Sequence, residues 1–124
     1  MKKLVAITAL VLGSVGFMLA APTAVTGVLV DKACYSKDKA NIANAHKGMG
    51  DTCAQDCARK GQQVALVTSA GEVYDVTGAL AANKNEKLVA HMSHTVTLTG
   101  EVSGAKGHMA IAATDLKMVS APKS

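Results

Sequence analysis

The clearest pattern in the sequence is a strict alternation of apolar and polar residues over positions 95–102. The segment reads TVTLTGEV, with Val, Leu and Gly at one set of alternate positions and Thr and Glu at the other. Successive side chains of a strand point to opposite faces, so the pattern predicts a strand with one buried and one solvated face. A chain of 124 residues allows one domain, not two.

Strand-like patterns recur in four other segments, which are residues 24–30, 64–68, 72–77 and 108–119. Ser69, Ala70 and Gly71 separate the second and third of these and predict a hairpin turn. The spacing of Leu80 and Leu88 predicts a helix over 79–91. This element order predicts a mainly β fold with short helices, a small OB-like five-stranded barrel. An open sheet with two or three packed helices is the alternative.

Residues 34–61 have no strand character and form an insertion after the first predicted strand. The composition predicts a short helix over 39–46 and a second helix from Cys53 to Lys60. Asp51 or Thr52 is a suitable cap for the second helix, and Gly61 is a suitable stop.

The N-terminal segment has the layout of a bacterial secretion signal. Two lysines, Lys2 and Lys3, precede an apolar stretch from Leu4 to Leu19, and small residues follow at Ala20 and Ala21. We therefore predict a signal peptide over 1–21, cleaved after Ala20 or Ala21, and a mature domain over 22–124. An uncleaved anchor is the alternative. Cleavage implies a periplasmic or secreted protein that meets the membrane only through its signal peptide.

Removal of this leader changes the composition. The whole chain has a net charge of +4 with 13 basic and 9 acidic residues, and only 2% of it is aromatic. The leader holds two of the lysines and Phe17, so the mature chain is nearly neutral and has two tyrosines as its only aromatic residues. A nucleic-acid-binding protein needs a basic face and usually stacking aromatics. We therefore expect no nucleic-acid partner. We also expect a monomer whose partner, still unknown, is a protein or a small molecule.

The chemistry is concentrated in the insertion, at Cys34, His46, Cys53 and Cys57. Cys53 and Cys57 are four residues apart, so on a helix they share one face and their sulfur atoms can converge on one ion. Three thiolates and an imidazole form a closed tetrahedral set of the kind that zinc prefers. The sequence therefore predicts a metal site at these four residues, with zinc as the favoured ion.

Two other interpretations of the cysteines stay open. Soft thiolates suit copper, so Cys53 and Cys57 can instead handle copper or perform thiol redox chemistry. The pairs His91-Met92 and His108-Met109 also mix imidazole with thioether, although core packing is the simpler role for both methionines. In the other interpretation, one disulfide staples a structural interaction domain and leaves the third cysteine unpaired.

No phosphate-binding glycine loop, no nucleophile elbow and no haem-attachment motif occurs in the sequence. No residue is therefore predicted to be catalytic. The sequence favours a binding module over an enzyme.

Several spaced residues extend over nearly the whole mature chain. They are Gly27, Asp31, Cys34, His46, Cys53-Ala54, Cys57, Gly61, Gly71-x-Val73-Tyr74, His91 and the run from Thr95 to Val102. On these residues the chain resembles a family of small exported bacterial proteins of unknown function with an OB-like barrel. The resemblance covers about Thr23 to Val119. It implies export and the barrel fold, and it implies no established activity.

Overall fold

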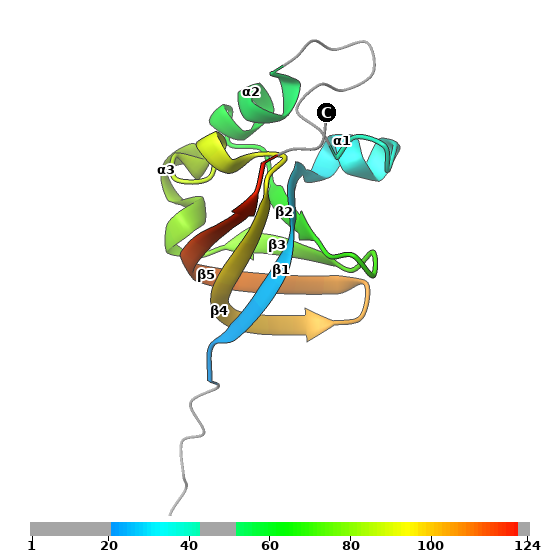
Figure 1. Cartoon of the computed structure of the whole chain (residues 1–124). Helices are drawn as coiled ribbons and strands as arrows, with labels where there is room; N and C mark the ends of the chain where they lie inside the picture. The colour runs from blue at the N-terminus through cyan, green and yellow to red at the C-terminus, as the bar shows by residue number, and fades with distance from the viewer. Residues whose placement is uncertain (1–20, 43–51, 122–124) are drawn as a thin grey trace, which may run out of the picture.

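The computed structural model describes residues 21–42 and 52–121. Five strands contain most of the regular structure. They are β1 (Thr23–Asp31), β2 (Val64–Val67), β3 (Val73–Thr77), β4 (Thr95–Ala105) and β5 (His108–Ser120). The strands are hydrogen-bonded in the closed order β1-β2-β3-β5-β4 (Figure 1). The predicted mainly β fold with short helices is confirmed, and the predicted strands lie within two residues of the observed ones except at the C-terminal end of β4.

All pairs of neighbouring strands are antiparallel except β3 and β5, which are parallel. The longest pairing joins β4 to β5, with a register shift between Thr99 and Gly100. A side chain at Gly100 would overlap the backbone of Ala112 on β5. Glycine is therefore required at this position, where the backbones of the two longest strands lie too close together for a side chain.

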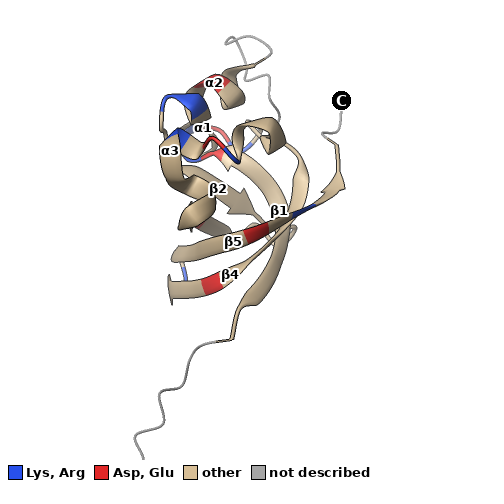
Figure 2. Ribbon diagram, turned by 90° about the vertical axis from the view of Figure 1, so that its left-hand side faces the viewer, with Lys and Arg blue, Asp and Glu red and all other residues tan. Residues whose placement is uncertain are grey.

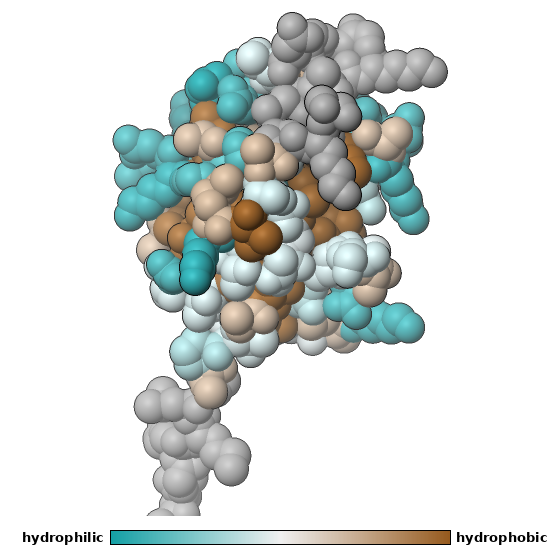
Figure 3. Space-filling model, in the orientation of Figure 1, coloured by the Kyte–Doolittle hydropathy of each residue, from teal (hydrophilic) through white to brown (hydrophobic). Residues whose placement is uncertain are grey.

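The main core lies inside the strands and under α2. It contains aliphatic residues and no aromatic ring among its fully buried members. These are Leu29, Ala54, Ala58, Val64, Leu66, Val76, Leu88, Met92, Val96, Leu98, Ile111 and Ala113. The surface in Figure 3 shows brown patches enclosed by white and teal residues.

Helix α1 (Lys32–Lys37) directly follows β1, earlier in the chain than predicted. Asp31 ends the strand and caps the helix, because its side chain accepts a hydrogen bond from the Ala33 amide at 3.3 Å. The predicted helix over 39–46 is wrong within the described residues, since residues 39–42 form turns. Tyr35 anchors α1, packing in a second buried cluster with β1 and β2 residues.

Helix α2 (Cys53–Arg59) confirms the second predicted helix of the insertion. Its buried residues are Ala54 and Ala58, which pack into the main core. Gly61 follows the helix with a positive φ of 84°, the conformation that glycine adopts at helix ends without strain. In Figure 1, α1 and α2 lie at the same end of the barrel, which we call the helical end.

The predicted helix over 79–91 is wrong, because the segment is broken into three short pieces. They are η1 (Ala79–Ala81), α3 (Ala82–Asn85) and η2 (Val89–His91). Asn83, Lys84 and Asn85 all have positive φ, which a continuous right-handed helix does not allow. The Asn85 amide donates to the carbonyls of Ala58 and Gln62 at 3.0 and 2.8 Å. The break thus places a buried amide under the end of α2.

The predicted signal peptide and cleavage site lie almost entirely outside the described residues. Among the residues that the structure describes, no helix is long and apolar enough to cross a membrane. Charges of both signs lie close together at the helical end, where Figure 2 shows red and blue segments near one another.

Candidate metal centre

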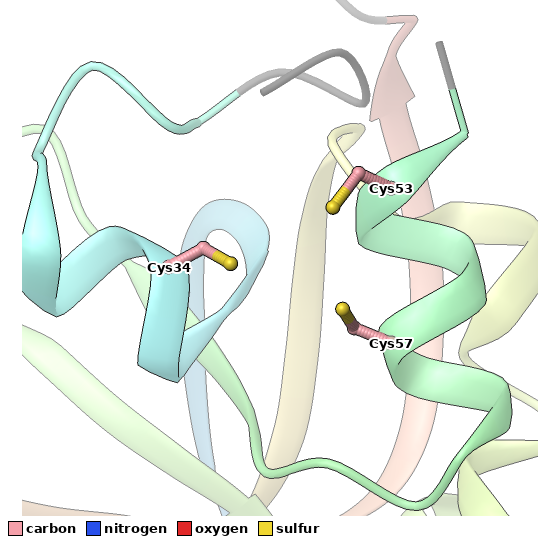
Figure 4. A group of neighbouring side chains, drawn as sticks. All are labelled: Cys34, Cys53 and Cys57. Carbon is pink, nitrogen blue, oxygen red and sulfur yellow. The ribbon is translucent and has the colours of Figure 1, made fainter. Parts of the chain in front are cut away.

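Three cysteines meet between α1 and α2 at the helical end. Cys34 projects from α1 toward α2, and Cys53 and Cys57 project from α2 toward α1 (Figure 4). Their Sγ atoms all lie within 4.8 Å of one another. Cys34 is buried, and the two α2 cysteines are half-buried. Residues far apart in the sequence thus form a compact triangle of sulfur atoms.

The local structure explains this convergence. Cys53 and Cys57 occupy one face of α2, and Ala54 and Ala58 occupy the adjacent face that packs on the core. Burial of the alanines therefore fixes the direction in which both thiols point. Because α2 is fixed in this way, its two thiols face α1.

On α1, Cys34 lies three residues after the capping Asp31 and so on the same side of the helix. Three contacts hold α1 in place. Lys32 forms an ion pair with Asp75 of β3 at 2.8 Å. The Lys32 amide donates to the Gln63 carbonyl at 3.0 Å. The Asn41 side chain donates to the Cys34 carbonyl at 3.0 Å.

The triangle has a size that suits a single ion. Bonds of about 2.3 Å from a tetrahedral zinc to sulfur separate two sulfur atoms by about 3.8 Å. The observed upper limit of 4.8 Å exceeds this by about one ångström, which side-chain rotation of half-buried cysteines can supply. The three thiols can therefore close on one metal ion without movement of the strands.

Asp31 lies beside this cluster of three cysteines, at the end of β1. Its side chain is almost fully buried, with 2% of the residue surface exposed. It is hydrogen-bonded to the side chains of both Cys34 and Cys57. In these bonds the thiols donate and the carboxylate accepts.

The environment makes both thiols weak acids. The hydrogen bond with Asp31 raises the pKa of Cys34 to about 11, helped by burial and by the charge of Asp31. Burial raises the pKa of Cys57 to about 12, and the hydrogen bond with Asp31 adds to the effect. Without a metal, both groups are therefore protonated at neutral pH and are poor nucleophiles.

Asp31 was not predicted as a site residue from the sequence. It was named only as one of the residues of the family resemblance. The available signal was its spacing, because an N-cap residue and the residue three positions later lie on the same side of a helix. Recognition of Asp31 as a cap would have placed it beside Cys34.

The other histidines and methionines that the sequence singled out do not lie in the cysteine cluster as the structure describes it. His46 lies outside the described residues. Met92 is fully buried in the main core, which confirms its predicted packing role. His94 donates a hydrogen bond from Nδ1 to the Met92 carbonyl at 3.0 Å. Within the described ranges no histidine joins a three-residue metal-ligand cluster.

No disulfide joins the three cysteines that the structure describes. The structure therefore does not contain the single disulfide that one interpretation of the sequence predicts. Cysteines that are not joined in disulfides can bind a metal, because each of them can lose its proton and become the thiolate that a metal binds.

Comparisons with protein-family models, with curated proteins and with solved structures gave no match. The resemblance to small exported bacterial proteins stays a prediction, and the function is inferred from the site.

Proposed function

We propose that this protein is an exported, non-catalytic module that binds one metal ion, and that the ion is zinc. The observation that carries the proposal is the convergence of Cys34, Cys53 and Cys57 to within 4.8 Å. A structural zinc ion is held by four donors. The cluster supplies three of them, so one further donor is required. The sequence nominates His46 for that position.

We infer an OB-like barrel as the scaffold of this module. The strand order, the parallel pairing of β3 with β5 and the helical segment between β3 and β4 all support it. Export to the periplasm or the medium is proposed from the leader-like residues 1–21, with a monomer as the mature form. Its partner is a protein or a small ligand. The N-terminal mass of protein recovered from the periplasm tests the cleavage.

Native mass spectrometry combined with thiol counting tests the metal proposal. The whole protein should carry one ion, and its three thiols should become alkylated only after a chelator removes that ion. Cys34→Ser and Cys57→Ser should each lower zinc occupancy, and His46→Ala tests the fourth donor that the sequence nominates. A metal-free protein whose mass is lower by about two units, from loss of two thiol hydrogens, would overturn the proposal.

Copper is the second candidate, because all three donors that meet in the cluster are soft sulfur atoms. Under this alternative, Cys53 and Cys57 of α2 form the essential pair. Copper uptake that survives Cys34→Ser but not Cys57→Ser would favour it over zinc.

A further inference from the structure

A groove lies between the tips of the β2–β3 and β4–β5 hairpins, which are on the same side of the barrel as α1 (Figure 1). The parallel pairing of β3 with β5 begins at Tyr74 and Met109, so the tips that precede these residues are not paired with each other. A hollow of about 750 Å³ lies there, and a second hollow of about 410 Å³ adjoins it toward α1. Val73, Gly107 and Met109 line both hollows. We call the two together the hairpin groove.

The larger hollow has mainly apolar walls, to which Val73, Tyr74 and Met109 contribute. Its two charged lining residues, Glu72 and Lys106, have opposite signs, and the Glu72 carboxylate accepts a hydrogen bond from the Tyr74 hydroxyl at 2.9 Å. Small-molecule sites are hollows of this size that are mostly apolar and have a few polar groups. The larger hollow therefore suits the uncharged, apolar part of a ligand.

The smaller hollow carries an excess of positive charge. Lys32 and Lys39 line it, together with a single acidic residue, Asp75. Asp75 is already paired with Lys32 at 2.8 Å, whereas Lys39 forms no ion pair within the described part of the chain. Ser36 and His108 also line this hollow and can donate hydrogen bonds. The chemical complement of this end of the groove is therefore an anionic group.

The positions of the tyrosines support a binding role for the groove. Tyr35 and Tyr74 are the only aromatic residues in the described part of the chain, and each of them lines one of the two hollows. Tyrosine combines an apolar ring with a polar hydroxyl, which suits it to binding surfaces. A chain with so few aromatic rings thus has both of them at one groove.

From these features we propose that the hairpin groove binds a single-chain organic acid, with the carboxylate beside Lys39 and the apolar chain between the hairpin tips. Membrane phospholipids also combine an anionic head with apolar chains. The volume of the larger hollow, about 750 Å³, is typical of small-molecule sites and favours the free acid. No cysteine lines the groove, so this inference does not depend on the proposed metal site.

Calorimetric titration of the whole protein with octanoate tests the proposal. One octanoate should bind, and octylammonium, which has the same chain and the opposite charge, should not. In a series from butanoate to octanoate, each CH₂ that becomes buried should tighten binding about fourfold. Vesicles of phosphatidylglycerol provide the membrane source of the same chemistry, and the protein should not sediment with them.

Two pairs of variants locate the ligand. Lys39→Gln should weaken octanoate binding about fivefold, the effect of one solvent-exposed ion pair. Lys37→Gln, which removes an exposed lysine of α1 outside the groove, should not change it. Met109→Gln should weaken binding about tenfold by adding a polar group to the apolar wall. Met118→Gln, on the same strand but outside the groove, is its matched control.

Melting temperatures confirm that the variants fold, and the chain-length series tests the apolar wall without any substitution. Absence of octanoate binding would overturn the proposal, as would equal binding of octanoate and octylammonium. Equal effects of Lys39→Gln and Lys37→Gln would show that the carboxylate does not lie beside Lys39. Sedimentation with vesicles in the absence of octanoate binding would assign the groove to a membrane surface instead.

Discussion

In the barrel, strands of up to 13 residues bury side chains such as Leu98 and Ile111 completely. At the helical end, two helices of six and seven residues contribute Tyr35 and two small alanines to the cores. Helices this short are not stable alone and depend on tertiary contacts. The difference indicates that apolar burial stabilises the barrel, whereas the helical end needs a further link between α1 and α2. The cysteine cluster lies where that link is required.

The largest effect should come from the barrel. Leu98→Ala removes a fully buried side chain from the main core and should lower the free energy of unfolding by about 3 kcal/mol. The loss should be the same with and without zinc, because Leu98 belongs to β4 and not to the helical end. Chemical denaturation under both conditions measures it, with Val119→Ala as an exposed control. A loss that appears only without zinc would contradict the separation of the two regions.

Metal removal should have the next largest effect, and at the other region. A ligand present at about 100 times its dissociation constant stabilises the folded state by about 2.7 kcal/mol. A chelator should remove this stabilisation from the wild type and change nothing in Cys57→Ser. Hydrogen exchange should show faster opening of α1 and α2 on chelation, while β4 stays protected. Equal loss of protection in β4 would show that the barrel depends on the metal as well.

Asn85→Ala tests how the barrel holds the helical end. The variant removes the two hydrogen bonds that the amide donates to the end of α2 and should cost about 1–2 kcal/mol. Zinc affinity should fall several-fold, because α2 presents Cys53 and Cys57. Asn83→Ala is the matched control, since Asn83 also has a positive φ but is exposed. An equal effect of both variants would attribute the loss to backbone conformation alone.

The sequence predicted the barrel strands better than the helices that flank the site. Alternation over 95–102 reports directly on burial, because each strand has an interior and an exterior face. The prediction of a helix over 79–91 was wrong because the conformation of Asn83 to Asn85 is set by long-range hydrogen bonds to α2. Local periodicity contains no information on such a contact.

In the candidate site, too, local spacing predicted one part of the arrangement, and the packing of distant segments determined the rest. The convergence of Cys53 and Cys57 followed from their spacing on one helix. The approach of Cys34 depends on how α1 and α2 pack on the barrel, which sequence spacing alone does not determine. The position of Asp31 beside the cysteines was not predicted, because this residue is both the last residue of β1 and the N-cap of α1. Its position depends on both elements.

The smallest effect concerns Tyr74 of β3, a partly buried residue that packs against the main core. Its hydroxyl donates to the Glu72 carboxylate at 2.9 Å, and this hydrogen bond raises the pKa of Tyr74 above its usual value, with burial and the charge of Glu72 adding to it. The bond contributes fully below the unfolded-state pKa of about 10. Its contribution is lost as the pH rises through the higher folded-state pKa, so stability falls with pH there.

Tyr74→Phe should therefore cost about 0.5 kcal/mol at neutral pH, because the pair is solvent-screened, and the cost should vanish in strongly alkaline solution. Denaturation of both proteins across this range measures the difference, and phenolate absorbance of a Tyr35→Phe background isolates the ionisation of Tyr74. Because Tyr74 lies on the barrel, zinc should leave the difference unchanged. A zinc-dependent difference would mean that the strand and the helical end are coupled through β3, by way of the Lys32–Asp75 ion pair.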